Sequence, residues 1–232
     1  PSTTSSDTVR TRTTQTTVPG ASPTGWLYGA VLDDARRNPI EAVRAHVSPR
    51  WGGAPVTASR TFLGLEPVDV LLFGHASDGL LRLVSVGCSR HPMTDPTAAL
   101  ADPVRGPRAE LVLTLRMAHP SVTEVWKTLA VFAAAPAVEG VVLTADALLD
   151  AGEPLWPGAP FTAVLLGASD VDDLPLPDPM DPVQFLAAVP VTATEAAWVR
   201  LRGADALRDA WAEADIDVRD PTRTAASLGP AG

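Results

Sequence analysis

The stretch FTAVLLGASDVDDLPLPDPMDPVQFLAAVPVTATEAAWVRLRG, residues 161–203, decides the fold. It holds two apolar runs, FTAVLLG at 161–167 and VQFLAAVPV at 183–191, and each has the length of a buried strand. Thr192 and Glu195 follow directly in the spacing of a capping box, which predicts that a helix begins there. The stretch therefore predicts two strands followed by a capped helix.

The chain continues as ADALRDAWAEADIDVRD, residues 204–220. Gly203 ends or kinks the first helix, and Leu207 and Trp211, about one helical turn apart, predict a second helix. Similar signals upstream predict helices at 39–48, from Ser121 and at 144–149, three strands within 55–86, and a strand at 108–117. This order of elements predicts an α+β fold with a mixed, mostly antiparallel sheet flanked by helices.

The predicted strand at 108–117, RAELVLTLRM, alternates in polarity along its length. Its odd positions are apolar from Leu111 to Met117, and its even positions include Glu110, Thr114 and Arg116. Since successive side chains of a strand point to opposite faces, this pattern predicts one buried face and one face toward solvent.

The domain boundaries are predicted from composition. Residues 1–24 contain 13 Ser or Thr and few sizeable apolar groups, so too little surface can be buried to offset the entropy of ordering. We expect a disordered tail at 1–24, a single folded domain at 25–224 and a flexible C-terminal tail at 225–232.

Several functional classes are excluded by composition. No apolar run reaches the length of a membrane span, and the single cysteine, Cys88, excludes an intrachain disulfide framework. The four histidines are scattered and no Gly-rich phosphate loop opens a strand–helix unit, so we expect neither a metal nor another cofactor. These features favour a cytoplasmic protein that does not bind membranes.

The negative charge is concentrated in the middle of the chain. Residues 128–199 carry ten acidic groups and no Lys or Arg, while the whole chain has a formal net charge of −9. This charge argues against nucleic-acid binding, because a negative surface repels phosphate backbones. It favours a basic protein partner, and the alternative is that it only keeps the protein soluble.

Five of these acids share a proline-rich loop and are candidate binding residues: Asp170, Asp172, Asp173, Asp178 and Asp181. The prolines make the loop stiff and extended, so it could serve as an acidic docking loop or remain a solvated loop. A calcium site is the third alternative, although the spacing of a calcium-binding loop is absent.

Two tryptophans, Trp51 and Trp156, lie in predicted loops and are also candidate binding residues. Tryptophan is enriched at the energetic centres of protein interfaces. The alternative is that each indole covers part of the core.

Cys88 and His91 are the residues that most resemble a catalytic pair. A catalytic cysteine needs a base within hydrogen-bond reach and a lowered thiol pKa. Side chains so close on one turn seldom align in this way, so we predict no catalytic residue and interpret Cys88 as a small buried group at a strand end.

Four segments, in this order, resemble the suppressor of fused-like domain of single-domain bacterial proteins: VSVGCSRHPM at 84–93, RAELVLTL at 108–115, GAPFTAVLLG at 158–167 and FLAAVPVTATEAAWVRLRGADAL at 185–207. The resemblance implies an α+β domain that binds another protein and has no catalytic centre. For bacterial members it further implies an immunity-type protein that neutralises a toxin. The alternatives are an accessory domain of a secretion system and a Cys-dependent hydrolase.

Overall fold

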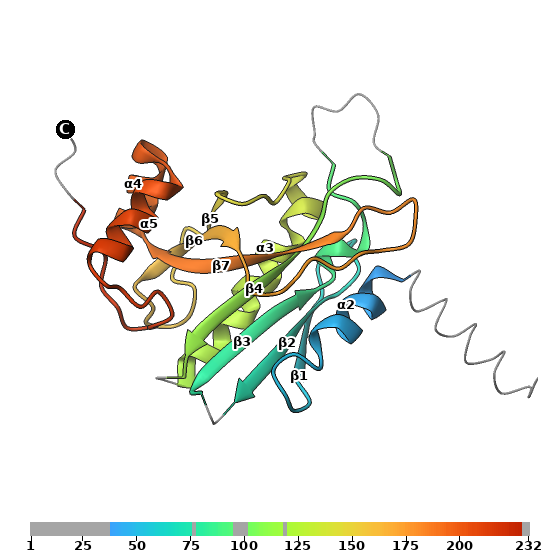
Figure 1. The fold of residues 1–232 in the computed structure, drawn as a ribbon, viewed down its shortest axis with the longest axis horizontal. Coiled ribbons are helices and arrows are strands. Elements are labelled where there is room, and N and C mark those ends of the chain that lie inside the picture. The colour runs from blue at the N-terminus through green and yellow to red at the C-terminus, as the bar shows by residue number, and fades with distance from the viewer. Residues whose placement is uncertain (1–37, 76–77, 95–101, 118–119, 229–232) are drawn as a thin grey trace, which may run out of the picture. The chain divides into compact units, whose positions relative to one another are not determined.

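The computed structural model describes residues 38–75, 78–94, 102–117 and 120–228 of the chain (Figure 1). The predicted tail at 1–24 and the first part of the predicted domain, 25–37, lie outside the described residues. The predicted class is confirmed, because the described part is a mixed, mostly antiparallel sheet flanked by helices.

Seven strands form one sheet in the order β1-β2-β3-β4-β7-β6-β5. Their bounds are β1 Val56–Arg60, β2 Val68–His75, β3 Leu80–Val86, β4 Arg108–Arg116, β5 Leu148–Asp150, β6 Phe161–Ala168 and β7 Val183–Thr192. Every neighbouring pair is antiparallel except β4 and β7, which are parallel and in register from Arg108 with Val183 to Val112 with Ala187. The second half of β7 pairs with β6, so β7 joins the two halves of the sheet.

The helices in the described part are α2 Pro39–Val47, α3 Trp126–Glu139, α4 Ala193–Arg202 and α5 Ala204–Glu213, with short 3-10 turns η1 Cys88–Arg90 and η2 Pro120–Val125. α3 packs on one face of the sheet against alternate strand residues such as Leu83, Leu113 and Leu166. The intervening residues belong to the opposite face, where α2 covers β2, β3 and β4 and α4 and α5 cover β6 and β7. The inner strands β3, β4 and β6 are therefore buried on both faces, while the edge strand β1 is largely exposed.

Local capping signals place two of the helices. The Asn38 side chain accepts a hydrogen bond from the Ile40 N–H at 3.1 Å, and Thr192 with Glu195 forms the predicted capping box at the start of α4. Gly203 separates α4 from α5 with φ of 88°, a conformation that glycine adopts without strain. These three predictions are confirmed.

The prediction that β4 buries only one face is wrong. Arg108, Glu110 and Val112 are buried like Ala109 and Leu111 between them, because β4 is a central strand covered by helices on both sides. The Glu110 carboxylate and the Nη atoms of Arg108 bind internal partners, while Nε of Arg108 is buried without one.

Two helix predictions are also corrected. Residues 144–149 do not form a helix, because Asp146 and Ala147 hydrogen-bond to Leu166 and the chain then pairs with β6 as the edge strand β5. The α-helix predicted from Ser121 begins five residues later, after η2, and its first turn has no side-chain cap. Sheet pairing in the first case, and 3-10 geometry in the second, outweigh local helix signals.

The predicted C-terminal tail at 225–232 is packed in its described part. Ala226 is buried in the core beneath α5, and its N–H donates a hydrogen bond of 3.1 Å to Oε1 of Glu195. Residues 226 and 228 thus pack on the domain, while residues 229–232 lie outside the described part.

Candidate functional site

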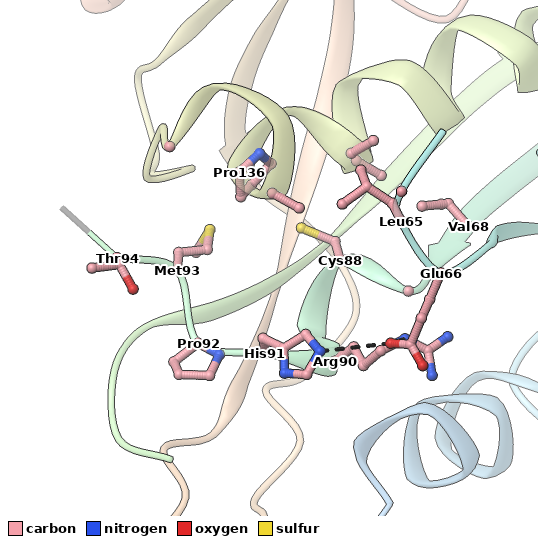
Figure 2. A pocket seen from close by; sticks show the side chains of 16 residues that line it. Leu65, Glu66, Val68, Cys88, Arg90, His91, Pro92, Met93, Thr94 and Pro136 are labelled. Carbon is pink, nitrogen blue, oxygen red and sulfur yellow. Dashed lines mark ion pairs between the residues drawn. The ribbon is translucent and has the colours of Figure 1, made fainter. Parts of the chain in front are cut away.

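An open pocket of about 520 Å³ lies beside the turn that contains Cys88. Its walls come from three segments: residues 64–68 at the start of β2, residues 87–94 after β3, and the last turns of α3 up to Gly140. Figure 2 shows Cys88, Leu65 and Pro136 around the pocket, with Glu66, Arg90 and His91 grouped on another side. The packing of α3 across the sheet thus brings together segments that are far apart in the sequence.

The hollow exists because small residues occupy positions that larger side chains could fill. Ala133, Ala134 and Ala137 of α3 line one wall, and Gly64, where a Cβ would meet no atom within 4 Å, lines another. Pro136 lies in the same wall of α3 and cannot donate a backbone hydrogen bond to the carbonyl group four residues earlier. The lining is mostly apolar, and its charged or titratable side chains, Glu66, Arg90 and His91, lie together.

Three charged or titratable side chains surround the mouth. Nε of Arg90 lies 2.8 Å from Oε2 of Glu66, and Nε2 of His91 lies 3.6 Å from the same oxygen. Glu66 and His91 are exposed, and Arg90 is half-buried. These groups are arranged as an ion-pair cluster that can contact a ligand at the surface.

Cys88 is poorly suited to act as a nucleophile. Burial, reinforced by the negative charge of Glu110, raises the pKa of the Cys88 thiol well above its usual value. The thiol therefore stays protonated at neutral pH, and the imidazole of His91 is directed to Glu66 instead. This geometry offers an apolar thiol to the pocket, and it does not support a hydrolase built on Cys88 and His91.

The backbone of the Cys88 turn is held by two buried side chains of β4 that the sequence analysis did not single out. Oε1 of Glu110 accepts hydrogen bonds from the N–H groups of Gly87 at 2.9 Å and Ser89 at 3.0 Å. Nη1 of Arg108 donates to the carbonyl oxygens of Ser89 at 2.7 Å and Arg90 at 3.0 Å. Glu110 thus binds backbone N–H groups of the turn, and Arg108 binds its backbone carbonyl oxygens.

Glu110 and Arg108 together form a clamp on the Cys88 turn, and burial shifts the pKa of each. Burial raises the pKa of Glu110, against four hydrogen bonds from Ser85, Gly87 and Ser89 that stabilise its carboxylate. Burial likewise lowers the pKa of Arg108. An Arg and a Glu two residues apart inside an apolar strand pattern were the sequence signal for this clamp, because charged residues are rarely buried without partners.

The acidic loop lies away from this pocket, on the face covered by α2. Asp170, Asp172, Asp173, Asp178 and Asp181 are all exposed. The loop is nevertheless attached to the domain, because Val171 is buried against α2 and Leu174 exchanges two backbone hydrogen bonds of 2.9 Å with Val183. Asp181 accepts a hydrogen bond of 2.5 Å from the Gly106 N–H, at the other end of the loop.

Arg50, the neighbour of Trp51 in the sequence, forms an ion pair with one of these acids. Nη1 of Arg50 lies 3.6 Å from Oδ2 of Asp172, while the half-buried indole of Trp51 packs edge-on against Phe73 with 5.0 Å between ring centres. Trp156 lies on the α3 side instead and is only 5% exposed. Its burial favours the alternative in which this indole covers the core.

No group of three His, Cys, Asp or Glu side chains among the described residues is placed to hold a metal ion. None of the helices in the described part is long and apolar enough to span a membrane.

The family follows from comparison with known sequences. A family model described as suppressor of fused protein (SUFU) matches residues 64–224. The chain belongs to the suppressor of fused family. The matched range contains the segments that form the pocket, so the pocket is part of the SUFU domain, and the resemblance seen in the sequence is confirmed.

Solved structures share the SUFU fold. A suppressor of fused homologue from Neisseria gonorrhoeae aligns with a TM-score of 0.52 and 17% identity, over 83% of this chain and 97% of that one. A chain of the Sufu–Fu complex aligns with a TM-score of 0.57 and 13% identity, over 82% and 92%. Drosophila Suppressor of Fused aligns with a TM-score of 0.52 and 12% identity, over 81% of this chain and 50% of that one. No curated protein sequence matches the chain.

Proposed function

We propose that this SUFU domain is a non-catalytic protein-binding module, and that the pocket beside Cys88 receives an apolar side chain of its partner. The observation that carries the proposal is the pocket itself: mostly apolar walls, a protonated thiol, and polar groups grouped at the mouth. Binding sites typically combine an apolar hollow with a few polar groups that fix orientation. The Sufu–Fu complex supports the role, since that SUFU protein is seen bound to another protein.

The partner that we propose is basic. The five exposed carboxylates of the loop from Asp170 to Asp181 would attract such a partner from a distance. The apolar pocket and the acidic loop would then have separate tasks, because the pocket fixes the bound partner and the loop accelerates its approach. A toxin neutralised by this domain is the specific form of partner that the resemblance to bacterial SUFU-like proteins favours.

The pocket can be tested with a matched pair of substitutions on α3. Ala137 is exposed and lines the pocket, so Ala137→Phe would place a ring across the hollow. Val138 is also exposed but does not line the pocket, so Val138→Phe adds a similar ring elsewhere on the same turn. Affinity capture with the tagged wild type should retain a partner that Val138→Phe also retains and Ala137→Phe loses.

Cys88→Ala tests the absence of catalysis in the same experiment. We expect this variant to retain the partner, because the thiol acts only as an apolar wall. Loss of the biological effect in a Cys88→Ala variant that still folds and binds would contradict a non-catalytic role. Retention of the partner by Ala137→Phe would place the binding surface elsewhere.

A further inference from the structure

Leu63 is a fully exposed leucine at the tip of the turn that leads into the pocket wall. The turn runs from Phe62 to Leu65 and is closed by a hydrogen bond of 3.1 Å from the Leu65 N–H to the Phe62 carbonyl oxygen. Gly64, at its third position, has φ of 78°, which is typical of a type II turn. An isolated exposed leucine is ordinary, but Leu63 directly precedes the residues that line the pocket.

Both sides of this turn are anchored. Phe62 packs against the main core, and the guanidinium of Arg60 lies 5.5 Å from the centre of its ring. On the other side, Leu65 lines the pocket. Leu63 is thus displayed on a turn that is already ordered, which reduces the entropy lost when the side chain is bound.

The protruding leucine and the pocket belong to the same short segment. Leu63 does not line the pocket, but the next three residues, Gly64, Leu65 and Glu66, do. A two-fold symmetric contact requires one surface patch to be complementary to itself. A protruding apolar side chain beside an apolar hollow meets that requirement, because two copies can exchange their leucines across an axis between them. The volume of about 520 Å³ is ample for one leucine side chain.

We infer that two copies of this chain associate symmetrically, with Leu63 of each copy bound in the Cys88 pocket of the other. The contact is small, so the association is weak, with a dissociation constant on the order of 0.1–1 mM. Each copy carries a formal charge of −9, so added salt should strengthen the dimer by screening repulsion. The inference uses the same pocket as the proposed function but needs no foreign partner, and a monomeric protein would leave that function standing.

The test is sedimentation equilibrium of the full chain over a concentration series up to about 1 mM, at low and high salt. The wild type and Val138→Phe should shift toward twice the monomer mass, more strongly at high salt. Leu63→Asp, which lacks the protruding side chain, and Ala137→Phe, whose pocket is filled, should each remain monomeric.

A mixture of the two monomeric variants provides the decisive control. Leu63→Asp keeps an open pocket and Ala137→Phe keeps its leucine, so one of the two contacts can form between them. We expect a mixed dimer that is weaker than that of the wild type, because only one of the two contacts can form, and that is detected by labelling one variant. A wild type that is monomeric throughout the series would overturn the inference, as would a Leu63→Asp variant that dimerises like the wild type.

Discussion

Glu195 and Arg223 form a buried ion pair in which Nη1 of the guanidinium lies 2.7 Å from Oε1 of the carboxylate. The carboxylate also accepts hydrogen bonds from the N–H groups of Thr192 at 2.8 Å and Ala226 at 3.1 Å, and from the indole of Trp211 at 2.9 Å. One side chain therefore connects the end of β7, helix α5 and the C-terminal segment.

Arg223 is held between aromatic rings as well. Its guanidinium lies 4.9 Å from the ring centre of Phe161 and 5.3 Å from that of Trp211, and Nη2 donates to the Pro190 carbonyl oxygen at 2.7 Å. Cation–π contacts strengthen when the cation is shielded from water. These contacts make Arg223 the anchor of the C-terminal segment on the SUFU domain.

Arg223→Met should lower the free energy of unfolding by about 3–5 kcal/mol, because it leaves a buried carboxylate without its cation. Urea denaturation at neutral pH measures this loss. Lys127→Met is the control, since Lys127 and Glu124 form an exposed ion pair, and its removal should cost less than about 1 kcal/mol. The proposed anchoring role would be refuted by an equal, small effect of both substitutions.

The Glu195 carboxylate should make stability depend on pH. Burial raises its pKa, but hydrogen bonds from Arg223, Thr192 and Trp211 outweigh burial, and the pKa in the folded protein lies below its usual value. The stabilisation is therefore complete above the unfolded-state pKa of about 4.3 and is lost as the pH falls through the folded-state value. The stability difference between the wild type and Glu195→Gln should shrink as the pH is lowered below about 4.

Glu110 should behave with the opposite sign. Its pKa is raised by burial, so its contribution is complete below about 4.3 and is lost as the pH rises through the higher folded-state value. The stability difference between the wild type and Glu110→Gln should thus be larger at acid pH than at neutral pH. If the stability difference from the wild type changed with pH in the same way for both Gln variants, the opposite pKa shifts assigned to Glu195 and Glu110 would be contradicted.

The sequence could predict features that depend on neighbouring residues, but not those that depend on residues far apart in the chain. The capping box at Thr192 and Glu195 and the apolar runs of β6 and β7 depend on neighbouring residues, and they are found as predicted. By contrast, the hydrogen bonds from Ser85 to Glu110 and from Arg223 to Glu195 join residues 25 and 28 positions apart. No local pattern identifies such partners, because the sheet order brings them together.

The pocket was missed for the same reason. Cys88 and His91 are close together in the sequence and could be compared with a catalytic pair. The hollow beside them is formed by alanines of α3 and by residues 64–66, which match no sequence motif of a binding site. The two loop tryptophans illustrate a related difficulty, because the packing of the whole domain decides that Trp156 is more deeply buried than Trp51.

Cys88 offers a probe for the clamp on its own turn, because it is the single cysteine of the chain. Arg108→Met removes the donors to the carbonyl oxygens of Ser89 and Arg90, so the turn should open more often and expose more of the half-buried thiol. Alkylation by iodoacetamide should accelerate about tenfold or more, since a tenfold change corresponds to about 1.4 kcal/mol of opening free energy. An Arg105→Met control, at an exposed arginine close to the same loop, should alkylate at the wild-type rate.

The acidic loop is best tested by reversing its charge while keeping its apolar anchors. In the triple variant Asp170→Lys, Asp172→Lys and Asp173→Lys, the residues Val171 and Leu174 remain to hold the loop against α2 and β7. The three carboxylates are exposed, so the free energy of unfolding should change by less than about 1 kcal/mol. An unchanged free energy of unfolding in the triple variant would therefore show that the loop is still folded and that any effect on binding comes from its charge.

Association is where the reversal should have its effect. With a partner recovered through the pocket, the association rate of the wild type should be high at low salt and fall steeply as salt is added, because screening weakens attraction between separated charges. The triple variant should associate at least tenfold more slowly at low salt and depend little on salt, while its dissociation rate stays near that of the wild type. Ala137→Phe should show the converse, a faster dissociation with the salt dependence retained, since the pocket acts after encounter. If the reversal leaves the association rate and its salt dependence unchanged, the loop only keeps the protein soluble, and the partner need not be basic.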